Sequence, residues 1–393
     1  MPAVCFHFKA HLPIHFKKIS FFELGKSPDL IDHQKNYRHL RQKLENIYLP
    51  VFSMFHDLIT TTRGDFHFSV SLSGTLLDQI EKHFSWFYRD LSDIVKLEET
   101  EMIASTYFHS MAYKYSFEEF MDQVDLHSKK NLAISGKKSN IFSNADPVYE
   151  SGWANHLHDQ HFKGVFLRRT DLGIPESSPG FLYQDADNER LRLILINEMY
   201  SDLLEDGWRL PPKDVKIILK KTIYESVRDD TEVILLQIDL EKFGKRGSEI
   251  KRRINLIKQF VQLSLESGKI VFLKPSEILE KLQPVDKLTI HEPIYPTYQK
   301  ITKTALFMRE ACRYLYSLED KIKKTSDKNL IYSWRMLQST DHILQLTGNE
   351  NRKIEIRSPY PDSSTIHEHF LNYMNALSCI DIYATNTKEQ SIN

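Results

Sequence analysis

Residues 233–244, with the sequence Val-Ile-Leu-Leu-Gln-Ile-Asp-Leu-Glu-Lys-Phe-Gly, decide the fold that the sequence predicts. The first part of this stretch is largely apolar and contains β-branched residues, which is typical of a strand that is buried on both faces. Strands of this kind belong to parallel sheets and barrels, in which functional side chains lie where the strands end. Two carboxylates, Asp239 and Glu241, come at that end. The stretch therefore predicts a buried strand that carries acidic groups to a site.

Short apolar segments alternate with longer, amphipathic segments over about the first 280 residues. We expect helices at residues 30–62, 75–91 and 116–131. Strands that alternate with helices indicate a parallel α/β arrangement, and seven or eight such units favour a barrel over an open sheet. The expected strands are residues 4–10, 66–72, 101–105, 140–143, 164–168, 191–197, 233–238 and, as an eighth strand or outside the barrel, 269–273.

The character of the sequence changes after residue 284, where prolines interrupt the pattern. Strand signals are weak beyond this break, and three amphipathic helices are expected at residues 298–324, 329–346 and 365–377. We therefore expect a barrel domain at residues 1–285 and an α-helical domain at residues 286–393.

Composition and charge narrow the class of protein. Lys and Arg number 52 against 53 Asp and Glu, so no basic excess points to a nucleic-acid partner. No apolar run is long enough for a membrane span, and the N-terminus predicts a strand instead of a signal peptide. Three widely spaced cysteines, Cys5, Cys312 and Cys379, favour reduced, buried thiols and a cytoplasmic location. The oligomeric state is left open.

Several of the predicted strands end in polar side chains, and a barrel brings such ends to one face. Two carboxylates on separate strands, with histidines and aromatics beside them, suit glycoside hydrolysis. One carboxylate attacks or stabilises the anomeric carbon, and the other protonates the leaving oxygen. Solvated loop residues and helix caps explain this pattern equally well. The residues concerned are His11, Tyr107, His109, Asp146, Asp239 and Glu241.

Five ordered segments carry a more specific signal, because together they resemble the α-amylase-like branch of glycoside hydrolase family 57 over nearly the whole chain. The segment Asp-Leu-Glu-Lys-Phe-Gly at 239–244 is similar to the family's Asp-Tyr-Glu-Thr-Phe-Gly. The others are Cys-Phe-His-Phe-Lys-Ala-His-Leu-Pro at 5–13, Phe-Ser-Val-Ser-Leu-Ser-Gly at 68–74, Thr-Tyr-Phe-His-Ser at 106–110 and Trp-Arg-Met-Leu-Gln-Ser-Thr-Asp-His at 334–342.

The resemblance implies an incomplete (β/α)7 barrel followed by a helical domain that contributes to the site. It also implies a retaining mechanism on α-glucans or maltooligosaccharides, and we expect no cofactor and no metal ion. Asp239 falls on the general acid/base of the family. For Trp334, packing between the helical domain and the barrel is favoured over a contact with sugar. The expected substrate contacts are His11, Tyr107, His109, Glu241, Trp334, Asp341 and His342.

The chain departs from the family pattern where the nucleophile is expected. The family has a glutamate in a segment like Asn-Thr-Glu-Leu, and this chain has Asn-Ala-Asp-Pro, with Asp146 at that position. The shorter side chain withdraws the oxygen by about 1 Å, which can cost about 100-fold in rate when a near-attack geometry is needed. Further departures lie at Leu12, Ser105 and residues 245–247. We therefore expect weak, altered or absent hydrolase activity, and a distance between Asp146 and Asp239 above the roughly 5–5.5 Å of retaining enzymes.

Two other functions compete with this interpretation. The first is a catalytically inactive glucan-binding protein of the same fold. The second is a metal-dependent polysaccharide deacetylase, whose barrel has a similar topology. That enzyme needs an aspartate and two histidines as metal ligands, and no compact His-x-x-x-His on a site loop supports it.

Overall fold

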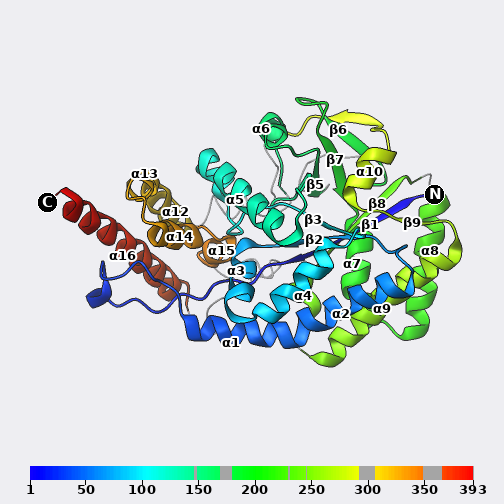
Figure 1. Cartoon of the computed structure of the whole chain (residues 1–393), viewed down its shortest axis with the longest axis horizontal. Coiled ribbons are helices and arrows are strands. Elements are labelled where there is room, and N and C mark those ends of the chain that lie inside the picture. Colours follow the sequence, from blue (N-terminus) through cyan, green and yellow to red (C-terminus); the bar gives the residue numbers. More distant parts are fainter. Residues whose placement is uncertain are drawn as a thin grey trace. The chain divides into compact units, whose positions relative to one another are not determined.

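The computed structural model describes residues 1–145, 148–168, 179–228, 231–244, 246–291, 306–347 and 365–392 (Figure 1). By packing, the chain forms two units, which we name by their content. The barrel unit contains residues 1–11, 40–105 and 124–294, and the helical unit contains residues 12–39, 106–123 and 295–393. Two segments from the first third of the chain therefore pack with the C-terminal helices. The domain boundary expected at residue 285 stays a prediction.

Seven parallel strands form the barrel and follow one another in chain order around it. The ring closes because β8 pairs with β1 along most of its length. A bridge of one residue pair, Ala104 with Phe142, links the end of β3 to β4, and β7 meets β8 at Ile196 and Leu235. The parallel barrel that the sequence predicts is thus confirmed. Its strands are β1 (Ala3–Ala10), β2 (Phe68–Leu72), β3 (Thr100–Met102), β4 (Ile141–Phe142), β5 (Gly164–Arg168), β7 (Arg192–Ile196) and β8 (Val233–Asp239).

Three short strands lie outside the ring. β6 (Leu182–Asp185) pairs antiparallel with β7, and β10 (Asp286–Leu288) pairs with β6. Neither was expected from the sequence. β9 (Val271–Phe272) pairs with Ala3 and Val4, on β1. The segment expected at 269–273 is therefore a strand outside the barrel, and not its eighth member.

The helices agree with the sequence in type and differ in detail. The segment expected at 30–62 is α1 (His33–Lys43), a π-helical turn (Leu44–Tyr48) and α2 (Leu49–Thr61), while that at 75–91 divides at Phe84 into two helices. In Figure 1, α9 runs beside α2 and α8 in the barrel unit. The remaining helices of this part are α3 (Gly74–His83), α4 (Ser85–Lys96), α5 (Phe117–Ser135), α6 (Ala154–Asp159), α7 (Glu198–Asp206), α8 (Pro212–Arg228), α9 (Gly247–Ser267) and α10 (Pro275–Lys281).

The helical unit contains the C-terminal helices that the sequence predicts. α12, α14 and α16 pack against one another, as Figure 1 shows. The expected helix at 365–377 is longer than predicted, and residues 298–305 lie outside the described part of the chain. The helices are α12 (Leu306–Ser317), α13 (Glu319–Lys323), α14 (Lys328–Leu337), α15 (Thr340–Gln345) and α16 (Ile366–Ile392).

The interior of the barrel becomes more polar toward the carboxyl ends of its strands. Side chains of a strand alternate between two faces, so Cys5, His7 and Lys9 of β1 share the inner one. Cys5 belongs to an apolar cluster with residues such as Phe166 and Leu235. Two and four residues further along, the register places His7 beside Gln237, and Lys9 beside Asp239. Charged groups are therefore concentrated where chemistry is expected in a parallel barrel.

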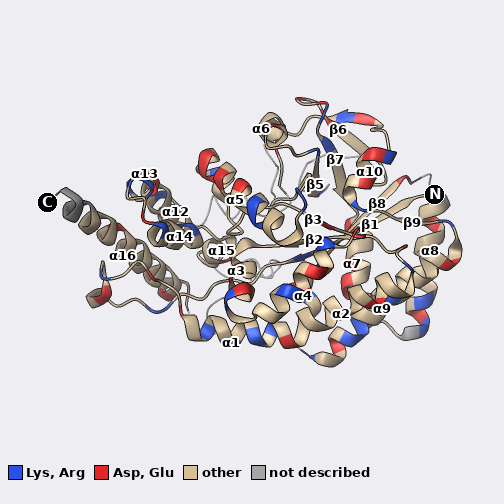
Figure 2. Cartoon of the chain, viewed as in Figure 1, with Lys and Arg blue, Asp and Glu red and all other residues tan. Residues whose placement is uncertain are grey.

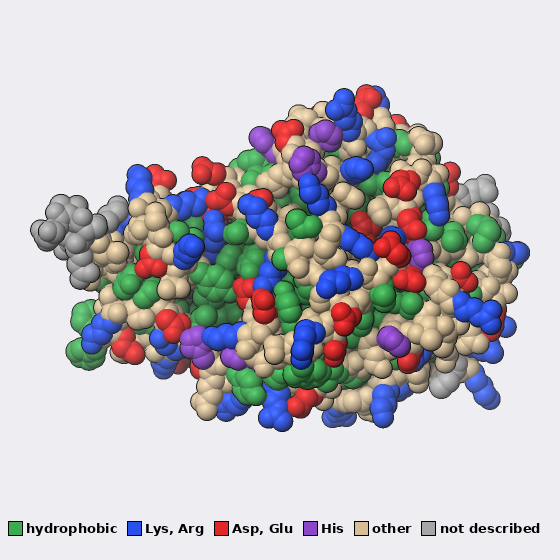
Figure 3. Space-filling model, viewed as in Figure 1, with side chains coloured by type: hydrophobic (Ala, Val, Ile, Leu, Met, Phe, Trp, Pro, Cys, Tyr) green, Lys and Arg blue, Asp and Glu red, His purple; other side chains and the backbone are tan. Residues whose placement is uncertain are grey.

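The surface mixes charges of both signs. α9 carries its Lys and Arg residues between a glutamate near each end (Figure 2), and the face drawn in Figure 3 shows both signs interspersed. Within the part of the chain that the structure describes, no helix combines the length and the apolar character that crossing a membrane requires.

Candidate active site

Asp239 lies at the carboxyl end of β8, where the sequence places the acid/base group. It is 6% exposed and lines a hollow of about 350 Å³ at the ends of β1, β5, β7 and β8, which we call the β8 hollow. None of the described residues that line it is aromatic, so stacking on a sugar ring has to come from elsewhere. The other lining residues are Lys9, Arg168, Ile196, Glu198, Ser201, Asp202, Glu205, Gln237 and Lys242.

Hydrogen bonds hold Asp239 on both sides of its Cα atom. Its carboxylate accepts the N–H of Glu241 at 3.0 Å, so Asp239 caps the 3₁₀ turn Leu240–Phe243. Its own N–H donates to Oε1 of Glu205 on α7 at 2.9 Å. Asp239 therefore both caps the turn and lines the hollow. The backbone at the predicted acid is fixed before any ligand binds.

An ion pair lies next to this acid. Nζ of Lys242 is 2.8 Å from Oε2 of Glu205. Burial raises the pKa of Glu205 above its ordinary value, and Lys242 opposes that effect. Burial lowers the pKa of Lys242, but the Glu205 carboxylate and then Asp239 outweigh burial, so the pKa lies above its ordinary value. At neutral pH the ammonium group is therefore charged, and Asp239 faces a cation as well as a second carboxyl group.

Lys9 links the strand beside Asp239 to the segment of the expected nucleophile. It is the register partner of Asp239, and its Nζ donates to the carbonyl oxygen of Ala145 at 3.0 Å. Asp146 itself lies outside the described residues, as does Pro147. The expected distance between Asp146 and Asp239 therefore stays a prediction, although the residue directly before Asp146 is tied to the hollow.

Two other expected substrate contacts in the barrel unit have partners inside the protein. The Glu241 side chain is 3% exposed, and its carboxylate receives Nζ of Lys43 at 2.7 Å and the hydroxyl of Tyr48. It does not line the β8 hollow, and its role as a substrate contact stays a prediction. His11 is buried, with Nδ1 at 2.8 Å from Oγ of Ser73.

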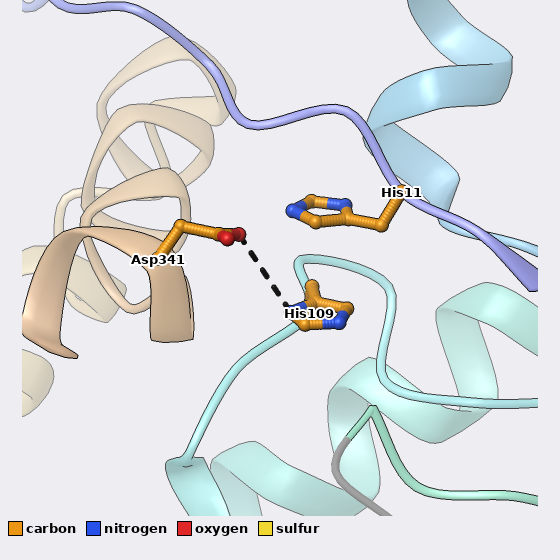
Figure 4. A group of neighbouring side chains, drawn as sticks. All are labelled: His11, His109 and Asp341. Carbon is orange, nitrogen blue, oxygen red and sulfur yellow. Dashed lines mark ion pairs between the residues drawn. The ribbon is translucent and has the colours of Figure 1, made fainter. Parts of the chain in front are cut away.

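In the helical unit, the structure brings His109 and Asp341 together (Figure 4). Nδ1 of His109 is 3.8 Å from Oδ2 of Asp341. His109 has a φ of +54°, a left-handed conformation that is unfavourable for residues other than glycine. Thr340 holds this conformation, because its N–H and its hydroxyl both donate to the His109 carbonyl, at 2.9 and 2.6 Å. Figure 4 also draws His11, which belongs to the barrel unit.

The remaining expected contacts in the helical unit are mostly buried. Trp334 has no exposed surface and donates its indole N–H to the carbonyl of Leu315, so it offers no face to a sugar. We therefore do not carry it into the proposed binding residues. His342 is 1% exposed and stacks on the ring of Phe16. Tyr107 is half-buried.

Apart from Asp239, sequence reasoning missed the charged residues that line the β8 hollow, and three of them lie next to Asp239. Lys9 could have been found from strand alternation, since it lies two residues before His11, which directly follows the same strand. Lys242 stands where the family motif has threonine, which marked it as unusual. Glu205 gave no signal, because it lies on a helix between two strands and only the packing of that helix brings it to Asp239.

Comparison with known proteins identifies the family. Residues 5–291 match the sequence model of glycosyl hydrolase family 57, and the chain belongs to that family. A protein from Methanocaldococcus jannaschii named "Putative alpha-amylase" is 22% identical over 408 residues, covering 97% of this chain and 84% of the relative.

Solved structures confirm the fold. The 4-alpha-glucanotransferase of Thermococcus litoralis has a TM-score of 0.66 at 14% identity, and the match covers 87% of this chain and 56% of that one. The chain thus spans little more than half the length of this enzyme. The alpha-amylase AmyC of Thermotoga maritima has a TM-score of 0.64 at 13% identity, covering 100% of this chain and 94% of that one. At these identities the likeness establishes the fold alone.

Proposed function

We propose that the chain is a retaining glycoside hydrolase or transglycosylase that acts on α-glucans, with weakened activity. The observation that carries the proposal is the setting of Asp239, a buried acid in a hollow at the carboxyl ends of the strands. Lys9, its neighbour in register, binds the carbonyl of Ala145. The similar enzymes, an alpha-amylase and a 4-alpha-glucanotransferase, support an α-glucan as substrate. A cytoplasmic location stays a prediction.

The proposed reaction has two steps. A carboxylate oxygen of Asp146 attacks the anomeric carbon while Asp239 gives its proton to the glycosidic oxygen, so the bond to the leaving sugar breaks. Asp239 then takes a proton from water, or from a hydroxyl group of a second sugar, and that oxygen displaces Asp146. Water gives hydrolysis, and a sugar hydroxyl gives transfer.

The length of Asp146 accounts for the proposed weakness. Compared with glutamate, aspartate lacks one methylene group, which moves the attacking oxygen by about 1 Å and can cost about 100-fold in rate. Aspartate has the same charge and nucleophilic group, so the chemistry itself is retained. Restoring the missing methylene is therefore the most direct test.

The test uses the full chain with maltoheptaose, and measures new reducing ends and product lengths over time. We expect slow product formation, a loss of at least about 100-fold in Asp239→Asn, and a similar loss in Asp146→Asn. Asp146→Glu is expected to raise the rate. Asp206→Asn is the matched control, because Asp206 is the half-exposed neighbour of Glu205 and pairs with Arg209.

Two results would contradict parts of the proposal. Product formation that is unchanged in Asp239→Asn removes the assignment of the acid. Wild-type turnover within the roughly 1–10³ s⁻¹ of ordinary enzymes, without gain in Asp146→Glu, removes the weakened activity.

The alternative function is a glucan-binding protein without turnover. The departures from the family pattern favour it, because they fall in segments expected to form the pocket while the framework segments persist. Calorimetry separates the two functions. Binding of uncleaved maltoheptaose with equal affinity in the wild type and in Asp239→Asn would favour the binding protein.

A further inference from the structure

Side chains of α7 continue the hydrogen bonding of β8 after its neighbour β7 has ended. The last contact between the two strands is at Ile196 and Leu235, and Asn197 then caps α7 by accepting the N–H of Tyr200. Alternate residues of a parallel strand direct their N–H groups to the same neighbour. Beyond Leu235, the N–H groups of residues 237 and 239 therefore point toward the side where β7 no longer lies.

Two residues of α7 accept these N–H groups. Oγ of Ser201 accepts the N–H of Gln237 at 3.0 Å, and Oε1 of Glu205 accepts the N–H of Asp239 at 2.9 Å. Four residues of a helix rise about 6 Å, and two residues of a strand rise about 6.6 Å. One face of α7 thus supplies acceptors at nearly the repeat of the missing strand. Figure 1 shows α7 beside the barrel strands.

Glu205 has a second partner on the other side of Asp239. It is 6% exposed, and its Oε2 receives Nζ of Lys242, three residues after the acid. One carboxylate therefore binds the backbone of Asp239 and the side chain of the turn that follows. The family motif has threonine at the position of Lys242, and threonine has no charged group that could form this ion pair.

We propose that Glu205 is a positioning residue for Asp239: it fixes the carboxyl end of β8 through the Asp239 N–H, and its charge influences when Asp239 releases its proton. The proposal rests on the proposed function only for its effect on activity. The charged groups that surround Asp239 in the hollow are Lys9 of β1, Arg168 of β5, Glu198 and Asp202 of α7, and Lys242 of the turn, with Glu241 turned toward Lys43.

Two variants separate the bond from the charge. Glu205→Gln keeps an acceptor for the N–H and removes the negative charge, so Asp239 is expected to titrate about 0.5–1 pH unit lower. The alkaline limb of the pH profile with maltoheptaose moves by the same amount. Glu205→Asp keeps the charge and shortens the reach, so the Asp239 amide is expected to exchange its hydrogen about 5-fold to 10-fold faster, while the titration stays in place.

The measurements are NMR titration of the ¹³C-labelled aspartate carboxyl groups and hydrogen exchange at the Asp239 amide, both on the full chain. Asp239→Asn assigns the signal, and Asp206→Asn, which changes an outward-facing acid of the same helix, is expected to alter neither result. An unchanged titration in Glu205→Gln, or an amide equally protected in Glu205→Asp, would overturn the proposal. Neither measurement needs turnover, so an inactive wild type would refute the proposed function and leave this test intact.

Ser201→Ala tests the other residue of α7 that accepts an N–H group of β8, and it is a small and conservative change. It removes the acceptor of the Gln237 N–H, and that amide is expected to exchange about 5-fold faster. An unchanged rate would refute the view that α7 replaces a strand beside β8.

Discussion

The two units hold their polar residues in different ways. In the barrel unit, the predicted acid continues a regular strand, and neutral buried histidines support the strands near it. His127 is an example, since its Nδ1 accepts the N–H of Ser105 and its Nε2–H donates to the carbonyl of Leu72. In the helical unit, His109 lies on an irregular segment with a left-handed backbone, and ion pairs and amide side chains hold it.

The ionic support of the helical unit centres on Glu119, which is fully buried. Arg335 binds both of its oxygens, at 2.8 and 3.0 Å, and Lys323 lies 3.1 Å from Oε2. Gln123 donates to Glu119 and to Gln338, and accepts the hydroxyl of Ser110, the residue after His109. The end of a strand therefore needs few side-chain bonds to position a residue, two from α7 in the case of β8, whereas the loop of His109 lies beside a larger network of side chains.

The comparison predicts its largest effect at Arg335. Arg335→Met leaves Glu119 buried with only Lys323 as a cation, and removal of one partner from a buried ion pair costs about 3–5 kcal/mol. We expect the free energy of unfolding to fall by that amount, measured by denaturant titration. Lys324→Met is the control, because its ion pair with Asp320 is exposed and is expected to contribute little. A loss no larger than that of the control would contradict the role of the network.

The barrel unit is expected to respond to pH instead. Burial lowers the pKa of His127 to about 4, although its bond to the Leu72 carbonyl opposes this, and burial and then Lys9 lower that of His7 to about 3. The unfolded chain takes up these protons near pH 6.5, while the folded chain does so only near these lower values. The contribution of each neutral histidine to the free energy of unfolding is therefore fully present above about pH 6.5. As the pH decreases below that value, this contribution falls by about 1.4 kcal/mol per pH unit for each histidine.

His127→Gln tests this expectation, because glutamine can both accept and donate. The measurement is the slope of the free energy of unfolding against pH, from pH 7 to pH 4.5. In the variant, this slope is expected to be smaller than in the wild type by the amount that corresponds to about one bound proton. His33→Gln serves as the comparison, since His33 is half-exposed and pairs with Asp29 at the surface. Equal slopes in the wild type and His127→Gln would contradict the neutral, buried histidine.

The smallest effect is expected at Glu241, where the sequence predicts a substrate contact and the structure shows bonds to other side chains of the barrel unit. Glu241→Gln weakens the bonds from Lys43 and Tyr48, and we expect a loss of about 1–2 kcal/mol in the free energy of unfolding with an unchanged KM for maltoheptaose. A large rise in KM without loss of stability would restore the role that the sequence predicts.

The part of the fold that repeats locally could be predicted from the sequence. Strands β1 and β8 are apolar, β-branched or aromatic runs with polar ends, so their burial and the position of Asp239 follow from the pattern. β6 and β10 were not predicted because they are short and are stabilised by tertiary pairing, β10 with β6 and β6 with β7, which local sequence does not encode. Periodicity also did not reveal that Phe84 divides the helix at 75–91.

The candidate site was predictable in its acid and less so in what surrounds it. The motif places Asp239 and Glu241 two residues apart, but the 3₁₀ turn between them directs only Asp239 into the hollow. For Trp334 the sequence favours packing inside the protein over a contact with sugar, and the complete burial of this side chain agrees with packing. The partners of Asp239, Glu205 and Lys9, are brought to it by tertiary structure.

The number of backbone pairs between neighbouring strands varies around the barrel. β4, β5 and β7 pair with one another through several residues, and among the described residues a bridge between Ala104 and Phe142 joins them to β3. At the other edge, the pair Ile196–Leu235 joins them to β8, and Gly180, which precedes β6, accepts the N–H groups of Glu232 and Val233. These three strands, with β6 and β10 attached, are therefore joined to the rest of the barrel through fewer backbone pairs than those that join β8, β1 and β2 to one another. Local opening of the barrel is expected to begin at these two edges. Asp239, at the end of β8, belongs to the more continuously paired part of the barrel.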